Sequence, residues 1–128
     1  MAAQLEIAET RAGDVTVLTL SGRLVPDEED LVFADHVDRL VAENRIHIVV
    51  DFHDVTCNSG GVGTLVAKFL SVRRRNGDVR LARVTDRTRH VLEITRLLSV
   101  FQVFDSIEEA IHSFSVDVPQ LPAEVAAR

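Results

Sequence analysis

Two kinds of segment alternate along this chain after an initial pair of strand-like segments. In one kind the apolar residues suit strands, and in the other they recur at the helical period. Residues 46–52 are rich in β-branched side chains and apolar on both faces, which predicts a central, parallel strand. Residues 15–20 are also apolar on both faces. The turn signal Ala12-Gly13-Asp14 before them predicts a hairpin with a weaker first strand. Shorter strands are expected from the apolar residues Leu5, Ile7 and Ala8, from Val79, Leu81 and Val84, and at 101–104.

Four amphipathic helices are predicted, because apolar residues recur there at i, i+3, i+4 and i+7. Pro26 and four acidic residues suit the start of the first helix, Thr85 or Asp86 can cap the third, and Ser106-Ile-Glu-Glu109 matches a capping box before the fourth. The expected core-facing residues are, helix by helix, Phe33, Val37, Leu40 and Val41; Val62, Leu65, Val66, Phe69 and Leu70; Val91, Leu92, Ile94, Leu97 and Leu98; and Ile107, Ala110, Ile111 and Phe114.

The order β-β-α-β-α-β-α-β-α, with short connections, predicts the fold class. It is typical of an α/β domain with a mixed, mostly parallel sheet of about five strands and about four helices. We assign residues 1–114 to this single domain. Residues 115–128, with Pro119, Pro122 and many small side chains, are predicted to form a disordered tail.

Composition excludes several classes of function. The net charge of −6 and the absence of Trp and Tyr argue against nucleic-acid binding, which needs a basic field and aromatic platforms. An acidic module favours a partner with a basic face. The single cysteine, the lack of a signal-peptide pattern and the lack of an apolar run of roughly 20 residues predict a cytoplasmic protein without direct membrane insertion.

The polar stretch 51–63 holds the candidate chemistry, but each catalytic hypothesis lacks a second group. Ser59 has no G-x-S-x-G context, and we expect it to be the N-cap of the following helix. Cys57 has no C-x-x-C partner and is expected to be a buried, inert thiol. Asp51 and Asp54 could pair as acid and base or hold Mg²⁺, but a strand-ending Asp after an apolar run is common in doubly wound folds, and the two carboxylates alone decide nothing. His47 and His53 share strand parity, but no Cys/His cluster accompanies them.

The glycines of this stretch could cradle a phosphate, but the P-loop lysine is missing. We therefore predict no cofactor, no metal site and no enzymatic activity.

Several separated motifs together resemble the STAS domain of anti-sigma factor antagonists. The resemblance covers about residues 5–114. It rests on Ser21-Gly-Arg-Leu24, Ile48-Val-Val-Asp51, Val55-Thr-Cys-Asn-Ser-Gly-Gly-Val-Gly63, Arg83-Val84-Thr85, Val91-Leu-Glu-Ile-Thr-Arg-Leu97 and Phe101-Gln-Val-Phe-Asp-Ser-Ile-Glu-Glu-Ala110.

The resemblance implies a binding module whose partner is an anti-sigma factor, a serine/threonine kinase with a histidine-kinase-like ATPase fold. Its docking surface would be a loop, here called the docking loop, with the start of the next helix. The loop comprises Asn58, Ser59, Gly60, Gly61, Val62 and Gly63. In better-known members the kinase phosphorylates a hydroxyl of a D-S-S-G-L-G loop, and the added charge and bulk break the complex.

The chain departs from that family pattern at the switch. Gly60 occupies the usual phosphoacceptor position, Asn58 replaces the loop aspartate, and Val25 replaces an aspartate near the acceptor. Two hypotheses follow. Ser59 is a displaced acceptor, or the module binds without the phosphoserine switch, which we favour because glycine has no hydroxyl.

A different class of function fits the same resemblance. STAS modules also serve as structural subunits of stress-signalling scaffolds, lipid-transport complexes and permeases. A homodimer is a further candidate assembly.

Overall fold

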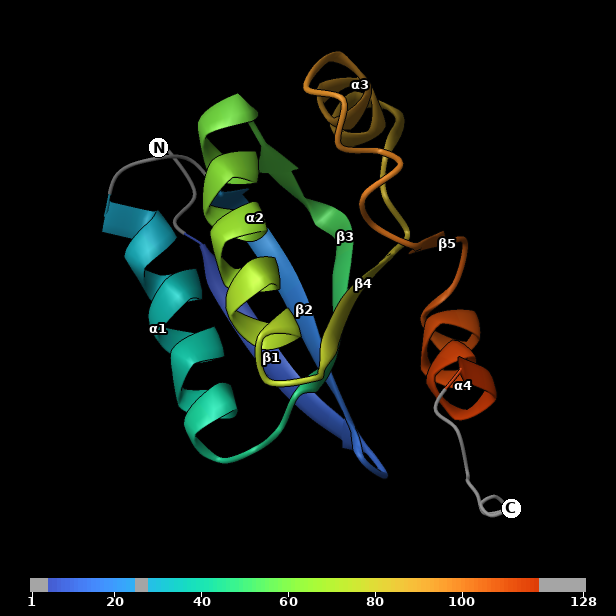
Figure 1. The fold of residues 1–128 in the computed structure, drawn as a ribbon. Helices are drawn as coiled ribbons and strands as arrows, with labels where there is room; N and C mark the ends of the chain where they lie inside the picture. Colours follow the sequence, from blue (N-terminus) through green and yellow to red (C-terminus); the bar gives the residue numbers. More distant parts are fainter. Residues whose placement is uncertain (1–4, 25–27, 118–128) are drawn as a thin grey trace.

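The computed structural model describes residues 5–24 and 28–117, and it confirms the predicted order of elements. Figure 1 shows these elements from the N-terminus in blue to the C-terminus in red. In chain order they are β1 (Glu6–Ala12), β2 (Val15–Leu24), α1 (Glu28–Ala42), β3 (His47–Cys57), α2 (Ser59–Arg73), β4 (Asp78–Ala82), α3 (Asp86–Ile94), β5 (Val103–Phe104) and α4 (Ile107–Asp117).

The five strands form one sheet in the order β1-β2-β3-β4-β5. β1 and β2 are antiparallel, whereas β2, β3, β4 and β5 are parallel to one another. This is the mixed, mostly parallel sheet that the sequence predicts. Because parallel strands end at the same edge, the carboxyl ends of β2, β3 and β4 lie together with the loops that follow them.

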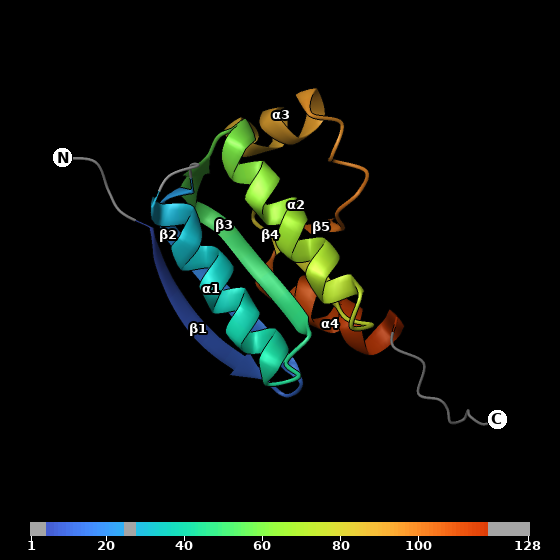
Figure 2. The same ribbon diagram turned by 60° about the vertical axis from the view of Figure 1, so that its left-hand side comes forward.

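Helices cover the two faces of the sheet unequally. α1 and α2 lie side by side on one face, with α3 near the N-terminal end of α2, and α4 lies alone on the other face (Figure 2). The larger core lies on the α1/α2 face and includes Leu18, Ile48 and Phe52, each 0% exposed. A smaller core joins Val17 and Val49 to α4. α4 therefore covers its face of the sheet only in part (Figure 2).

Helix ends show capping geometry in several places, and at the starts of α3 and α4 it is the geometry that the sequence predicts. Asn44 has a left-handed φ of 62° just beyond α1, and Asn76 has a φ of 69° beyond α2. Thr85 caps α3, with its side chain accepting from the Thr88 N–H, and Ser106 Oγ accepts the Glu109 N–H at 3.1 Å before α4.

Two predicted apolar faces are partly wrong. Leu70 of α2 and Ile94 of α3 are 47% and 63% exposed, so they do not face the core. α3 also ends at Ile94, before Leu97 and Leu98, because Arg96 turns the chain with a φ of 62°. Leu97 packs against the core from the following loop, with its N–H donating to the Leu92 carbonyl.

The C-terminal end of the domain differs slightly in extent from the expected boundary. α4 continues to Asp117, three residues beyond 114, while residues 118–128 of the predicted tail lie outside the described residues. Within the part of the chain that the structure describes, no helix is both long and apolar enough to cross a membrane.

Candidate functional site

The docking loop is the junction between the central strand β3 and α2. Asn58 caps the helix with an extended backbone, φ −100° and ψ −179°, and its Oδ1 accepts the Gly61 N–H at 2.8 Å. The prediction that Ser59 is the N-cap is therefore wrong by one residue, and Ser59 is the first residue of α2. Asn58 is the N-cap because its amide oxygen accepts a hydrogen bond from the third helical N–H, that of Gly61.

Gly61 is buried and anchors the start of α2 on the end of β2. A Cβ added there would lie 2.0 Å from the carbonyl oxygen of Leu24 and 3.1 Å from Cys57 Sγ. Only glycine allows this backbone-to-backbone approach. Val62 is also buried, at 1% exposed. These two residues hold the loop in place and present no side chain to a partner.

The exposed part of the loop continues along α2. Helical spacing places Gly63, Ala67, Leu70 and Arg74 in one line, and all four are exposed, as is Ser59 at the start of the helix. We call these five residues the outer face of α2. A Cβ at Gly63 would meet nothing within 4 Å, so no packing inside the chain requires glycine there.

An apolar side chain from α1 lies beside this face. Leu31 is 59% exposed. It lies seven residues before Asp38, on the same side of α1, and Asp38 contacts Lys68 of α2 at 2.9 Å. Because α1 and α2 run in the same direction (Figure 1), Leu31 is level with the first turns of α2.

Cys57 is buried as predicted, at 4% exposed. Its Sγ–H donates to the Asn58 carbonyl at 3.4 Å, and burial raises the thiol pKa to about 12. A thiol that stays protonated near neutral pH is a poor nucleophile.

The two carboxylates within β3, Asp51 and Asp54, have separate partners. Asp51 is 1% exposed and accepts two hydrogen bonds from Arg83, at 3.0 Å from Nε and 2.7 Å from Nη2. Asp54 instead pairs with His53 Nδ1 at 2.9 Å. No group of three or more potential metal ligands occurs among the described residues. The two carboxylates do not contact each other, so the arrangement is a structural ion pair between β3 and the end of β4, not a paired acid and base.

Sequence reasoning used Arg83 only as part of the motif Arg83-Val84-Thr85 and missed its ion pair with Asp51. Its φ of 55° is left-handed, and this turn at the end of β4 directs the guanidinium back across the sheet to β3. The sequence placed it near the end of the strand expected from Val79, Leu81 and Val84, and it gave no sign that Asp51 would lie alongside on the neighbouring strand. Val25, the other position compared with the family pattern, lies outside the described residues.

The fold and the helix-capping loop together define an α/β module of the STAS class. The model of the STAS domain family matches residues 6–110, and the chain belongs to this family. No curated protein matches the chain closely enough to count as a relative.

Several solved structures share the fold. An anti-sigma factor antagonist from Mycobacterium paratuberculosis is 19% identical, with a TM-score of 0.75, and the match covers 88% of this chain and 97% of that one. The phosphorylated form of the Bacillus cell fate determinant SpoIIAA is 20% identical, with a TM-score of 0.64 and coverage of 88% and 98%. A sulfate transporter family protein from Wolinella succinogenes is 18% identical, with a TM-score of 0.68 and coverage of 84% and 89%.

Proposed function

We propose that this chain is an anti-sigma factor antagonist-like regulatory module. It binds a serine-kinase anti-sigma factor through the exposed residues of the docking loop and the outer face of α2. Membership of the STAS family and the structural likeness to anti-sigma factor antagonists support this class of partner. The activity is binding, and no catalytic step is assigned to the chain.

Gly63 is the observation that supports this docking surface best. Glycine within a helix costs roughly 0.5–1 kcal/mol relative to alanine, and nothing inside the chain uses its missing Cβ. Because contacts within the chain do not require glycine at position 63, we attribute it to binding: without a side chain, Gly63 lets a partner approach the helix backbone closely. Ala67 continues this low surface, and Leu70 and Leu31 add exposed apolar contacts beside it.

We further propose that the complex forms without the usual phosphoserine switch. Gly60 has no hydroxyl, and Ser59 lies one residue earlier at the first position of α2. The two positions differ by about 100° around a helix axis, so a kinase that presents its phosphate to residue 60 would not address Ser59.

Binding of the purified anti-sigma kinase, measured by calorimetry, tests the docking surface. Gly63→Glu adds bulk and charge where the chain itself has open space, and we expect it to weaken binding at least about tenfold. Gly63→Ala should fold at least as well as the parent. Ala42→Glu is the matched control. Ala42 is exposed at the C-terminal end of α1, far from Leu31 and the docking loop, so this variant should bind normally. Equal affinity of Gly63→Glu and the parent would refute the surface.

Incubation of the chain with the kinase and ATP, followed by intact-mass spectrometry, tests the switch separately. We expect no added phosphate. Phosphate on Ser59 that disappears in Ser59→Ala, together with loss of binding after modification, would restore the displaced-acceptor hypothesis.

A structural subunit of a stress-signalling scaffold or of a lipid-transport or permease complex is the second candidate. The observation that favours it is the shared fold with a sulfate transporter family protein. Affinity capture from the native cell distinguishes the two functions, because a kinase of the ATPase type supports the first and a permease or scaffold protein supports the second.

A further inference from the structure

β1 presents an open edge of the sheet. It is the first strand in the sheet order, so its outer side has no neighbouring strand among the described residues. Its seven residues, Glu6–Ala12, contain no proline, and their register against β2 is continuous without a bulge. Proteins usually block such edges with proline, bulges or charged side chains, because an open edge can pair with another strand. β1 lacks the first two but carries Glu6, Glu9 and Arg11, so a second strand must match these charges.

The hairpin turn determines which backbone groups point outward. Gly13 and Asp14 form a two-residue turn, and Ala12 pairs with Val15 directly beside it. Residues that flank a two-residue turn form a hydrogen-bonded pair, and this pairing alternates along the ladder. The N–H and C=O groups of Ile7, Glu9 and Arg11 therefore point to the free edge, where they can bond a second strand.

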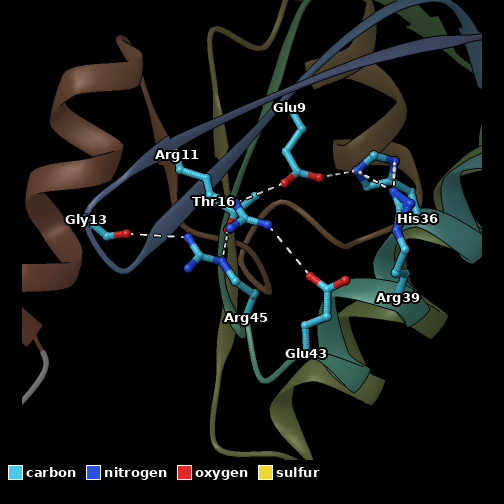
Figure 3. Close-up of polar contacts among 8 residues, drawn as sticks. All are labelled: Glu9, Arg11, Gly13, Thr16, His36, Arg39, Glu43 and Arg45. Atoms are coloured by element: carbon cyan, nitrogen blue, oxygen red, sulfur yellow. Dashed lines mark hydrogen bonds and ion pairs between the residues drawn. The ribbon is translucent and has the colours of Figure 1, made fainter.

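The side chains of the same residues have opposite charges. Figure 3 shows Glu9 and Arg11 on the α1 side of β1, with Arg11 Nε 3.2 Å from Glu9 Oε2. The hydrogen bond from His36 holds the pKa of Glu9 below its ordinary value, so this carboxylate is ionised at neutral pH. Within the chain, Arg11 Nη2 also lies 3.7 Å from Glu43 Oε1 of α1 (Figure 3). The Arg11 side chain is 53% exposed and the Glu9 side chain 24%, so both retain surface that solvent reaches.

We propose that β1 pairs with β1 of a second copy of this chain, antiparallel about a twofold axis at Thr10. This register places Glu9 opposite Arg11 of the second copy, and Arg11 opposite its Glu9. Both are hydrogen-bonded pairs of the new ladder, and oppositely charged cross-strand pairs stabilise a sheet. An axis at Glu9 would instead place two carboxylates opposite each other.

The other face of the ladder fits the same register. Thr10 lies opposite Thr10 of the second copy, and Ala8 lies opposite its Ala12. Alternation along β1 places these small side chains on the face opposite Glu9 and Arg11, where α4 lies away from β1 (Figure 2). The outer face of α2 lies beyond α1 from this edge, and the dimer leaves it free. The dimer therefore does not depend on the proposed kinase partner.

The mass in solution tests the dimer. Sedimentation of the parent chain should show a mass that rises with concentration from 14.2 kDa toward twice that value. Arg11→Glu should weaken association roughly tenfold or more, since both cross-strand pairs become repulsive. Arg23→Glu, the same charge change on an exposed residue of β2, should associate like the parent. A parent that remains monomeric at ~1 mM would overturn the proposal, since even weak, small interfaces are populated there.

Cross-linking tests the register and does not depend on the charge variants. A non-hydrogen-bonded pair has Cα atoms about 4.5 Å apart, within the range of a disulfide. Thr10→Cys should therefore form a covalent dimer under mild oxidation. Ala8→Cys should not, because residue 8 of one copy lies opposite Ala12 of the other, and the two introduced cysteines are several residues apart along the ladder. Equal cross-linking of both variants, or of neither, would overturn this register.

Discussion

Asp51 and Arg83 join the middle of β3 to the end of β4 through a bidentate ion pair at 3.0 and 2.7 Å. Asp51 is 1% exposed on β3, whereas the Arg83 side chain is 37% exposed just after β4. The hydrogen bond to Asp51 raises the pKa of Arg83 above its ordinary value, so the cation is permanent. The pair lies where β4 ends beside the middle of β3, six residues before β3 leads into the docking loop.

Removing the two partners should have unequal effects. Arg83→Ala leaves a carboxylate buried without its cation, which is strongly destabilising in buried pairs. Asp51→Ala leaves a partly exposed guanidinium that water can solvate, so we expect a smaller loss. Urea denaturation of both variants measures the difference. A larger loss for Asp51→Ala would show that the carboxylate contributes chiefly through its hydrogen bond from the His53 N–H.

The left-handed backbone of Arg83 can be separated from its charge. Arg83→Gly loses the ion pair but adopts a φ of 55° without steric cost, whereas Arg83→Ala loses the pair and keeps the strain. Arg83→Gly should therefore be the more stable of the two variants in the same denaturation experiment. Equal stability would mean that the backbone relaxes once the guanidinium is gone.

Two glycines in the first turns of α2 should respond oppositely to alanine. Gly61→Ala places a methyl group against the Leu24 carbonyl and should destabilise the fold by about 1–3 kcal/mol. Gly63→Ala meets open space and should stabilise it by about 0.5–1 kcal/mol. Thermal melts of the pair measure both effects. A stabilised Gly61→Ala would contradict the close approach of α2 to the end of β2.

The N-cap can be assigned by a similar comparison. Asn58→Ala removes the bond to the Gly61 N–H and should cost about 0.5–2 kcal/mol, whereas Asn58→Asp keeps an acceptor and should be close to neutral. Ser59→Ala, within the helix, should change stability by less than about 0.5 kcal/mol. If Ser59→Ala cost more than Asn58→Ala in urea denaturation, the original prediction of a serine cap would be correct after all.

Sequence periodicity predicted the strands and helices because burial imposes it directly. The apolar run of β3 is buried in the structure, and so is the stripe of Phe33, Val37 and Leu40 on α1. In both, the apolar pattern follows directly from burial against the core. The same logic failed at Leu70 and Ile94, since an apolar period cannot distinguish a side chain that faces the core from one on an exposed face. Burial of Gly61 was also hidden, because its contact is with a strand 37 residues earlier.

The ion pair of Asp51 was beyond sequence analysis for a different reason. An arginine with a left-handed backbone conformation is uncommon. At Arg83 the ion pair with the buried Asp51 carboxylate on the neighbouring strand stabilises this conformation. Neither residue predicts the other without the strand order. Recognition of a family could supply the fold, but this contact required the register between β3 and β4, in which Asp51 pairs with Ala82.

The Cys57 thiol predicts a loss of stability at alkaline pH. Burial raises its pKa in the folded chain from 9.0 to about 12, so between these values the unfolded chain releases a proton that the folded chain keeps. Because the unfolded state then binds fewer protons, the free energy of unfolding falls by up to about 1.4 kcal/mol per pH unit in this window. Below pH 9 the thiol is protonated in both states and makes no pH-dependent contribution.

Urea denaturation at pH 8 and pH 10.5, for the parent and for Cys57→Ala, isolates this effect from the other groups that titrate there. The parent should lose more stability than Cys57→Ala between the two pH values, although the variant starts lower because it leaves a small cavity. The same burial predicts that iodoacetamide at pH 8 modifies the folded chain far more slowly than the chain in urea, since only the thiolate reacts. Rapid alkylation of the folded chain would show that Cys57 is accessible, and the docking loop would then have to open in solution.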